Sequence, residues 1–159
     1  MSADTARGAP VKIPPALLYL LGFLAGVIWR FVVPGDALPA ALAASARWLG
    51  LSLIVAGFTL SMSGVVTFLR AKTTTLPHRA ASRLVVSGPY RFTRNPMYVG
   101  INAFYIGLAL AMNRLWPLAL LPLLFVILVR SVIRLEERYM EERFGDEYRA
   151  YRRSVRRFL

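Results

Sequence analysis

Apolar runs of about membrane length constrain this chain more than any other feature. They extend from about residue 15 to 33, 48 to 69, 97 to 112 and 115 to 133. A helix of about 20 apolar residues crosses the hydrocarbon core of a bilayer, which is about 30 Å thick. Hydrophobic residues make up 57% of the 159 residues and mean hydropathy is +0.51, more than a soluble domain usually has. We therefore expect an all-α fold, a polytopic membrane helical bundle of about four transmembrane helices.

The boundaries of the runs differ in clarity. The first begins after a Pro-Pro step and is longer than the apolar core of a signal peptide. The second contains Gly50, Gly57 and Gly64, which permit close helix packing, and its helix could begin earlier, after Leu38. The third is short, so it would tilt or form half of a tight hairpin. The fourth has two prolines near its start, where a helix tolerates them or kinks.

Lysine and arginine predict the orientation. They precede the first run, fill the connection from Arg70 to Asn95, and recur from Arg134 onward. Loops rich in these residues stay in the cytoplasm. We therefore expect both termini and the 70–95 loop to be cytoplasmic, in a bacterial inner membrane. Residues 1–14 would form a short tail, and residues 15–159 a single membrane domain that ends in a cytoplasmic amphipathic helix over 134–159.

Composition also excludes several chemistries. The chain has no cysteine, so a disulfide framework, a cysteine zinc site and thiol catalysis are ruled out. Its single histidine, His78, cannot build a histidine metal cluster, and we assign it no role. The net charge of +12 lies in blocks that flank the apolar runs, which favours anionic lipid head groups over nucleic acid as partners.

The segment GPYRFTRNPMYVG, residues 88–100, is unusually polar for the start of an apolar run. Gly88-Pro89 predicts a turn, and Pro96 predicts the first residue of the third helix, with Asn95 as its N-cap. The N-terminus of that helix could hold a carboxylate. The alternative is an ordinary membrane boundary, with arginines on lipid phosphates and tyrosines in the aromatic belt.

Two acidic residues, Glu136 and Glu137, follow the fourth run. Adjacent residues on a helix point about 100° apart, so one could face a pocket while its neighbour pairs with an arginine. The alternative is a solvated helix with Arg134–Glu137 and Arg138–Glu142 pairs. In the predicted orientation, the glutamates and the 88–100 segment meet on the cytoplasmic side and could frame one pocket, open to water and to lipid.

The last segment, FGDEYRAYRRSVRRF, predicts a turn and a basic amphipathic helix. Phe144, Tyr148, Tyr151 and Val155 form its apolar stripe. This helix could lie on the membrane surface, and it could also cover the pocket. In the third run, Asn102 is expected to bond a neighbouring helix rather than a ligand.

Three blocks carry a resemblance to a known family. They comprise Gly88, Tyr90, Arg94, Asn95, Pro96, Tyr98 and Gly100, then Glu136-Glu137, then Phe144, Gly145, Glu147, Tyr148 and Tyr151. In this order and spacing the chain resembles the integral-membrane methyltransferases that include isoprenylcysteine carboxyl methyltransferases and phospholipid (phosphatidylethanolamine) N-methyltransferases. The resemblance covers roughly residues 73–155. Asn95 stands where well-studied members have histidine, which argues against general-base chemistry at that position.

The resemblance implies an enzyme that transfers a methyl group from S-adenosylmethionine to a lipophilic acceptor reaching it from the bilayer. The implied cofactor contacts are Tyr90, Arg94, Asn95, Pro96, Tyr98, Gly100, Glu136, Glu137 and Tyr148. Arg134, or alternatively Arg130, and Glu137 are the expected catalytic residues. No metal is expected.

The expected acceptor is an isoprenylcysteine-type carboxylate or a related small lipid. A phospholipid amine, as in phosphatidylethanolamine, is the alternative, because an amine could lose its proton to one of the glutamates. An alternative of another class is a non-catalytic membrane protein that binds lipid or assists assembly. A transporter is disfavoured, since ionisable residues do not form a path through the apolar runs.

Overall fold

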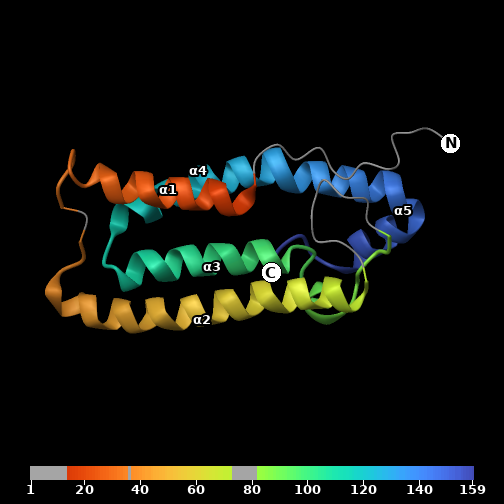
Figure 1. Cartoon of the computed structure of the whole chain (residues 1–159), viewed down its shortest axis with the longest axis horizontal. Coiled ribbons are helices and arrows are strands. Elements are labelled where there is room, and N and C mark those ends of the chain that lie inside the picture. Colours follow the sequence, from red (N-terminus) through yellow and green to blue (C-terminus); the bar gives the residue numbers. More distant parts are fainter. Residues whose placement is uncertain (1–13, 36, 73–81) are drawn as a thin grey trace.

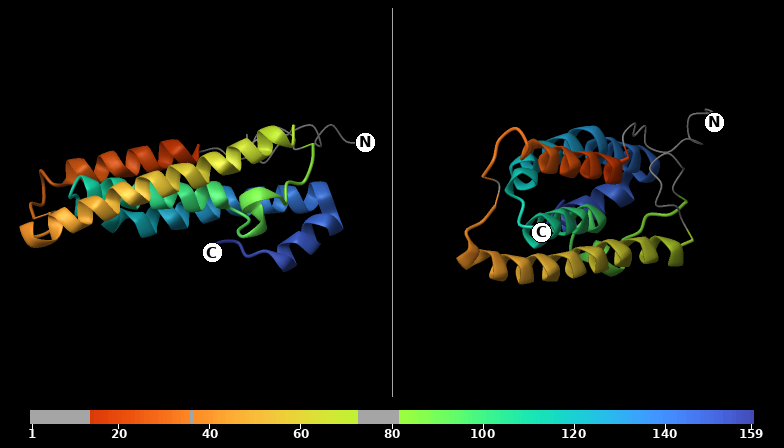
Figure 2. Two further views of the ribbon diagram at one scale, coloured as in Figure 1. Left: turned by 90° about the horizontal axis from the view of Figure 1, so that it is seen from below. Right: turned by 60° about the vertical axis from the view of Figure 1, so that its left-hand side comes forward.

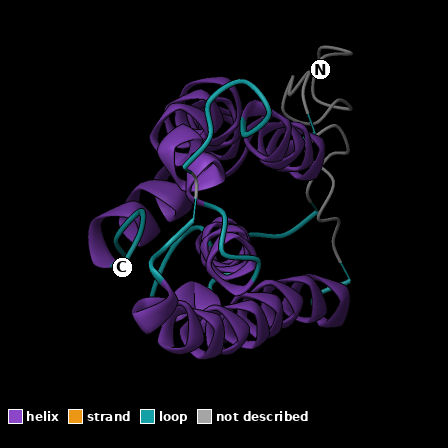
Figure 3. Cartoon of the chain, turned by 90° about the vertical axis from the view of Figure 1, so that its left-hand side faces the viewer, coloured by secondary structure: helices purple, strands orange, loops and turns teal. Residues whose placement is uncertain are grey.

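The computed structural model describes residues 14–35, 37–72 and 82–159, and these ranges contain helices and loops but no strand (Figure 3). The α-helices are α1 (Pro15–Trp29), α2 (Ala40–Arg70), α3 (Pro96–Ala111), α4 (Leu115–Leu128) and α5 (Arg134–Ser154). A short 3₁₀ helix, η2 (Gly88–Arg91), precedes α3, and a π-helical turn, η3 (Val129–Ile133), joins α4 to α5. The all-α prediction is therefore confirmed for the described residues. The predicted tail lies almost wholly outside them, and so does His78.

Proline sets the start of several helices. Pro15 and Pro96 occupy the first positions of α1 and α3, where proline's missing N–H costs nothing and its fixed φ suits a helix. Helix α2 follows Pro39 directly, so the earlier of its two expected starts is the correct one. Helix α1 ends at Trp29, four residues before the end of its apolar run.

Helices α2 and α3 form an antiparallel pair with little space between their backbones (Figure 1). Glycines at seven-residue spacing on α2, namely Gly50, Gly57 and Gly64, face α3 and are buried. A Cβ atom built on Gly57 would lie 2.5 Å from the carbonyl oxygen of Gly100, and one on Gly50 would lie 2.6 Å from that of Gly107. Close approach through small residues stabilises helix pairs in lipid.

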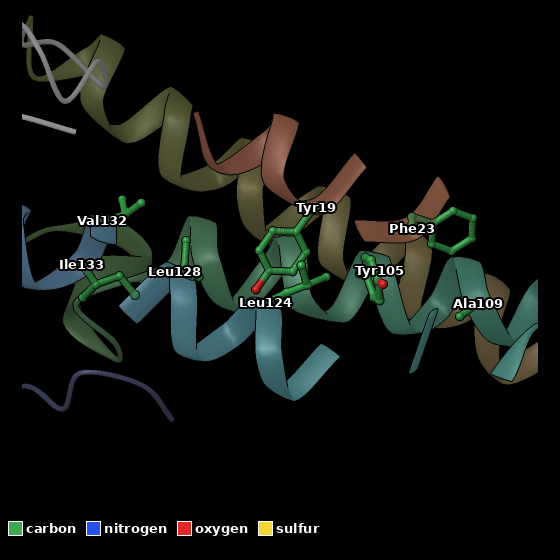
Figure 4. Close-up of a cluster of buried hydrophobic side chains, with 8 residues drawn as sticks. All are labelled: Tyr19, Phe23, Tyr105, Ala109, Leu124, Leu128, Val132 and Ile133. Carbon is green, nitrogen blue, oxygen red and sulfur yellow. The ribbon is translucent and has the colours of Figure 1, made fainter. Parts of the chain in front are cut away.

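Helices α1 and α4 form the second antiparallel pair. Gly26 of α1 lies against the backbone of Pro117, and Gly22 lies against the Leu124 side chain. Aromatic rings join this pair to α3: Tyr105 contacts both Tyr19 and Phe23 edge to face, with centroids 5.5 and 5.4 Å apart (Figure 4). Figure 4 shows the rest of this buried cluster, which consists of Ala109, Leu124, Leu128, Val132 and Ile133.

The outward faces of the helices are apolar. Large hydrophobic side chains on α1 and α2 are exposed, among them Leu20, Ile28, Trp48, Val55 and Phe58. Two helices, α2 and the continuous helix that begins at Leu115, are long and apolar enough to cross a membrane. Helices α1 and α3 have 15 and 16 residues, so they are shorter than a full crossing requires. The described residues therefore contain two candidate membrane spans, fewer than the four predicted.

Helix α5 bends back on itself. Gly145 has φ 52° and ψ −122°, which no helix residue adopts, and it divides α5 into two arms. The second arm returns beneath η2 and the start of α3 (Figure 2). An ion pair between Arg152 and Glu141, 2.8 Å apart, joins the two arms. The bend therefore brings the last residues of the chain back to the 88–100 segment.

Candidate functional site

The start of α3 and the start of α5 lie side by side, as the sequence predicted. The Tyr98 hydroxyl donates a 2.7 Å hydrogen bond to Oε1 of Glu136. The Arg94 guanidinium forms a 2.8 Å ion pair with Oε1 of Glu137. Two segments about forty residues apart in the chain thus form one polar cluster at the end of an otherwise apolar bundle.

Tyr90 is held from two sides. Its ring lies edge to face with Phe68 of α2, with centroids 5.2 Å apart, and its backbone carbonyl accepts a 2.7 Å hydrogen bond from the Tyr151 hydroxyl. The residue is buried, and its own hydroxyl has no hydrogen-bond partner among the described residues. Burial raises the pKa of this phenol, so it stays protonated and able to donate. A buried polar group without a partner costs about 1–3 kcal/mol unless a ligand or water satisfies it.

Arg94 is the centre of the cluster. Its terminal nitrogen Nη1 donates to Glu137 and, at 3.3 Å, to the Tyr148 hydroxyl. Its Nε is buried and has no partner in the described part of the chain. Burial and the charge of Glu137 raise the pKa of the Tyr148 phenol. Tyr90 and Arg94 therefore each present one unsatisfied donor.

Glu137 is paired with a second arginine that the sequence analysis missed. Arg157 donates from Nε to Oε1 of Glu137 at 3.0 Å and from its terminal nitrogen Nη2 to Oε2 at 2.5 Å. The proposed alternative pair between Glu137 and Arg134 is therefore wrong, because Arg94 and Arg157 occupy this carboxylate. Only the path of the chain after α5 brings Arg157 here, and no local spacing signals it.

Glu136 differs from its neighbour. The pKa of its carboxyl is raised to about 7: burial is the main cause, the charge of Glu137 adds to it, and the hydrogen bond from Tyr98 acts in the opposite direction. No arginine of the described ranges forms an ion pair with it. At neutral pH this carboxylate is therefore partly ionised, and no cation of the described residues contacts it directly.

The second arm of α5 covers the cluster. Tyr148 and Tyr151 are buried together with Val85 and Tyr90, and Phe144 and Val155 pack against them. The apolar stripe predicted for this helix thus faces the protein, as expected of a cover, and is not left free to lie on a membrane surface. The hydroxyl of Tyr148, on this arm, accepts a hydrogen bond from Arg94.

Three residues with an implied cofactor role have structural contacts instead. Asn95 precedes α3 but does not cap it, because its side-chain amide donates to the carbonyl of Arg157 at 2.9 Å. Pro96 is buried at the first position of α3. Gly100 lies on the face of α3 that packs against Gly57 of α2. Their contact with a cofactor stays a prediction.

Arg134 and Arg130 lie outside the cluster. Both side chains are exposed, and neither forms a hydrogen bond or an ion pair with a described residue. The catalytic role expected for Arg134 therefore stays a prediction without a supporting contact. Asn102 behaves as expected: its amide oxygen accepts from Tyr19 of α1 at 3.0 Å, and its amide nitrogen donates to the Tyr98 carbonyl at 2.7 Å. The part of the chain that the structure describes has no group of three or more acidic, histidine or cysteine residues that could hold a metal ion.

Comparison with known proteins points to one family. The sequence model of the family described as "Phospholipid methyltransferase" matches residues 45–147, well over half of the chain. The cobalt-zinc-cadmium resistance protein CzcN of Cupriavidus metallidurans is 31% identical over 135 residues, which cover 83% of this chain and 62% of that protein. The nickel-cobalt-cadmium resistance protein NccN of Alcaligenes xylosoxydans xylosoxydans is 28% identical over the same shares of both chains.

A third relative is an uncharacterized protein of Haemophilus influenzae, 48% identical over 38 residues, which are 23% of this chain and 60% of that protein. The chain thus spans less than two thirds of the length of each of these relatives. No solved structure matches it.

Proposed function

This chain belongs to the phospholipid methyltransferase family, and we propose that it transfers a methyl group from S-adenosylmethionine to a lipophilic acceptor at the cytoplasmic face of a membrane. The observation that carries the proposal is the polar cluster of Tyr90, Arg94, Tyr98 and the two glutamates at one end of an apolar bundle. Buried polar groups at such a boundary need partners, and two of them, the Tyr90 hydroxyl and Arg94 Nε, lack one among the described residues.

The cluster fits the polar groups of S-adenosylmethionine. This cofactor supplies a methyl group on a positively charged sulfur, and it also carries an ammonium, a carboxylate and ribose hydroxyls. Glu136 offers an uncompensated carboxylate to a cation. Tyr90 and Arg94 offer free donors, the phenol hydroxyl and Nε, to acceptor oxygens. We assign cofactor binding to these three residues first, with Tyr98 holding Glu136 in place.

The cover formed by Tyr148 and Tyr151 supports a group-transfer reaction. Displacement at a sulfonium needs alignment and the removal of water more than it needs covalent help from the protein. Buried tyrosines of the second arm of α5 close one side of the cluster, so water is excluded there. The apolar surfaces of the helices leave the acceptor a route from the bilayer.

The charges of the site favour an amine acceptor over a carboxylate. A carboxylate acceptor needs an arginine to orient it, and the two arginines expected in that role, Arg134 and Arg130, are exposed and make no contact with the cluster. Glu136, which no cation contacts directly, favours a cationic group beside it over an anionic one. A protonated amine head group must also lose its proton before it attacks, and water at the cytoplasmic face can accept that proton. We therefore place a phospholipid-type amine first and an isoprenylcysteine-type carboxylate second.

We also propose that the chain crosses the membrane four times, with the cluster at the cytoplasmic face. Helices α1 and α3 would cross as shorter members of the bundle, packed against α4 and α2. The basic residues around the cluster, among them Arg83, Arg91 and Arg94, fit the cytoplasmic side of a membrane. A bacterial inner membrane is the expected location.

A transfer assay with the purified protein in lipid nanodiscs tests the proposal. Radiolabelled S-adenosylmethionine would be incubated with extracted bacterial lipids and, separately, with small prenylated thiols. We expect label in an amine-bearing lipid, and loss of transfer in Glu136→Ala but not in Glu142→Ala, an exposed acid on the same helix.

The outcomes separate the alternatives. Label in the prenylated thiol alone would move the acceptor to the carboxylate class. No label in either acceptor, together with no calorimetric binding of the cofactor, would reject the methyltransferase. In that case the non-catalytic alternative, a lipid-binding or assembly protein, would stand.

A further inference from the structure

The residues that follow α5 form a strap across the 88–100 segment. We use the name for Val155–Leu159, whose first residue is extended with φ −124° and ψ 133°. The Arg94 amide donates to the Arg156 carbonyl at 2.9 Å. The Thr93 hydroxyl and the side-chain amide of Asn95 both donate to the Arg157 carbonyl, at 3.1 and 2.9 Å. Three consecutive residues of the motif are thus bonded to two consecutive carbonyls of the strap.

An aromatic contact anchors the far end of the strap. The Phe158 ring lies 5.2 Å from that of Phe125 in α4, and Phe158 packs against the main buried cluster. Arg157 is therefore held on both sides, by the Arg156 carbonyl before it and by Phe158 after it. These contacts fix the backbone of Arg157, and so they also fix the position of its Cα atom, from which the side chain extends.

The Arg157 side chain makes a two-point contact with Glu137. Nε donates to one carboxylate oxygen and Nη2 to the other, at 3.0 and 2.5 Å. The Glu137 side chain is 12% exposed and that of Arg157 38%. Planar, charge-assisted contacts of this kind fix orientation as well as adding energy. Glu137 is thus locked between Arg157 and Arg94.

We infer that Arg157 is a positioning residue of this site: it fixes the Glu137 carboxylate and, together with Arg94, more than offsets its charge, so that Glu136 is the one carboxylate of the pair left for the ligand. The identity of that ligand rests on the proposed function, but the electrostatic arrangement does not. Arg157 acts through Glu137 and not by contact with a reacting group.

Titration of Glu136 in the ligand-free protein tests the inference directly. The titratable groups that face Glu136 are Tyr98 of α3, Tyr90 of η2 and Glu137 of α5, and the arginines Arg94 and Arg157 act on it through Glu137. Glutamate carboxyls labelled with ¹³C would be followed by NMR, with Glu136→Gln to assign the signal. We expect Arg157→Gln to raise the midpoint of Glu136 by at least about half a pH unit, because Glu137 loses one of its two neutralising cations.

Two further variants control this measurement. Arg153→Gln removes an exposed arginine four residues away and should leave the midpoint of Glu136 unchanged. The double variant Glu137→Gln/Arg157→Gln removes the charge together with its partner, and it also serves if Arg157→Gln does not fold. Its midpoint should lie at or below that of the wild type. A higher midpoint in the double variant, or no shift in Arg157→Gln, would overturn the inference.

Ligand selectivity gives a second readout. S-adenosylmethionine and S-adenosylhomocysteine differ in the charge on sulfur, so their affinity ratio reports the negative charge of the site. At about pH 8.5, where Glu136 is ionised, Arg157→Gln should shift this ratio several-fold toward the sulfonium, and Arg153→Gln should not. If the wild type binds neither compound, the proposed function fails while the NMR titration still decides the role of Arg157. If the wild type binds both and Arg157→Gln changes neither the ratio nor the midpoint, the inference fails and the proposed function stands.

Discussion

Glu136 and Glu137 are neighbours in the chain with opposite electrostatic surroundings. Glu137 receives Arg94 and Arg157, whereas Glu136 receives only the neutral hydroxyl of Tyr98. Because adjacent helix residues point in different directions, one turn of α5 can hold both a neutralised carboxylate and an uncompensated one. The pair is therefore suited to two tasks, maintaining the site and attracting a cation.

Replacing Glu136 should weaken cofactor binding. A hydrogen bond to a charged group contributes about 1.5–3 kcal/mol, which corresponds to roughly 10–100-fold in the dissociation constant. We expect a loss of this size for S-adenosylmethionine in Glu136→Gln, measured by isothermal titration calorimetry. Glu142→Gln, at an exposed position of α5, is the control. Equal affinities in the two variants would remove Glu136 from the site.

The stability of the ligand-free protein should depend on pH through Glu136. Its pKa is about 7 in the folded protein and 4.5 ordinarily, so the folded state binds the proton more tightly. Stability from this group is complete below about pH 4.5 and falls as pH rises to about 7, by on the order of 3 kcal/mol at most. Between about pH 4.5 and 7, the thermal unfolding midpoint should fall more steeply with rising pH for the wild type than for Glu136→Gln. The same pH dependence in both proteins would contradict the raised pKa of Glu136.

Sequence reasoning predicted the meeting of Tyr98 and Arg94 with the glutamates, but not the partners of Asn95 and Glu137. The meeting of the two segments follows from the placement of positive charge, which predicts that both lie on one side of the membrane. The partners of Asn95 and Glu137 depend on the path of the strap after α5, and helix spacing carries no information about that path. Arg134 stands three residues from Glu137, yet Arg157 reaches the same carboxylate from twenty residues away.

At the level of helices, Gly50, Gly57 and Gly64 of α2 form a glycine seam against α3, and we expect this seam not to tolerate larger residues. In Gly57→Ala the new Cβ would meet the Gly100 carbonyl oxygen at 2.5 Å, so the helices must separate. Overpacking of this kind costs about 1–3 kcal/mol. We expect a lower unfolding midpoint in Gly57→Ala and little change in Val55→Leu, which adds volume on the outward face. Thermal unfolding in detergent measures both, and an unchanged Gly57→Ala would mean that the pair is not close-packed.

The bend of α5 makes a separate prediction. Gly145 has a backbone conformation that other residues adopt at a cost of about 1–3 kcal/mol. Gly145→Ala should therefore lower both stability and cofactor affinity, because the second arm carries Tyr148 and Tyr151. Gly35, with φ 93° and open space around it, provides the matched control.

Gly35→Ala introduces the same kind of backbone strain at the opposite end of the bundle. This variant should lower the stability of the protein, while its affinity for the cofactor, measured by calorimetry, should be unchanged. A loss of affinity in both variants would indicate a general effect of destabilisation and not a role of the bend.

Helix boundaries followed from local signals where proline or an apolar run marks them, as at Pro96 and Leu115. The return of α5 could not be predicted in this way. A stripe of Phe144, Tyr148 and Tyr151 fits a lipid surface and a protein surface equally well, and the choice depends on Tyr90 and Val85 being within reach. The π-helical turn η3 shifts the register between α4 and α5, and no residue pattern announces it.

For the whole molecule, the candidate site lies at one end of the bundle, and the contacts at the opposite end hold the loops together. There the two interhelix loops are tied together, as Asn113 accepts from the Leu38 amide at 2.8 Å and Trp116 donates to the Val33 carbonyl at 2.9 Å. The helices between these ends present apolar side chains outward. Polar contacts at the two ends and apolar side chains between them are the arrangement expected of a helical bundle that crosses a membrane.

Orientation can be measured because the chain has no cysteine of its own. We expect an introduced cysteine in Arg153→Cys to react with an impermeant maleimide only when the cytoplasmic side is opened. Ala37→Cys, exposed at the other end, should react in intact cells. Labelling of both positions from the same side would contradict the four-crossing arrangement.

The glycine seam also reaches the cluster. A Cβ on Gly64 would lie 3.3 Å from the Tyr90 hydroxyl, so the same face of α2 that packs on α3 forms a wall behind this tyrosine. At 31 residues α2 is about 46 Å long, more than the hydrocarbon thickness, and such a helix adjusts to a thinner or thicker bilayer by changing its tilt. Because Tyr90 packs on α2 at Gly64 and Phe68, we expect a change of this tilt to move Tyr90 with it. Acyl-chain length in the surrounding lipid is then expected to affect this end of the protein.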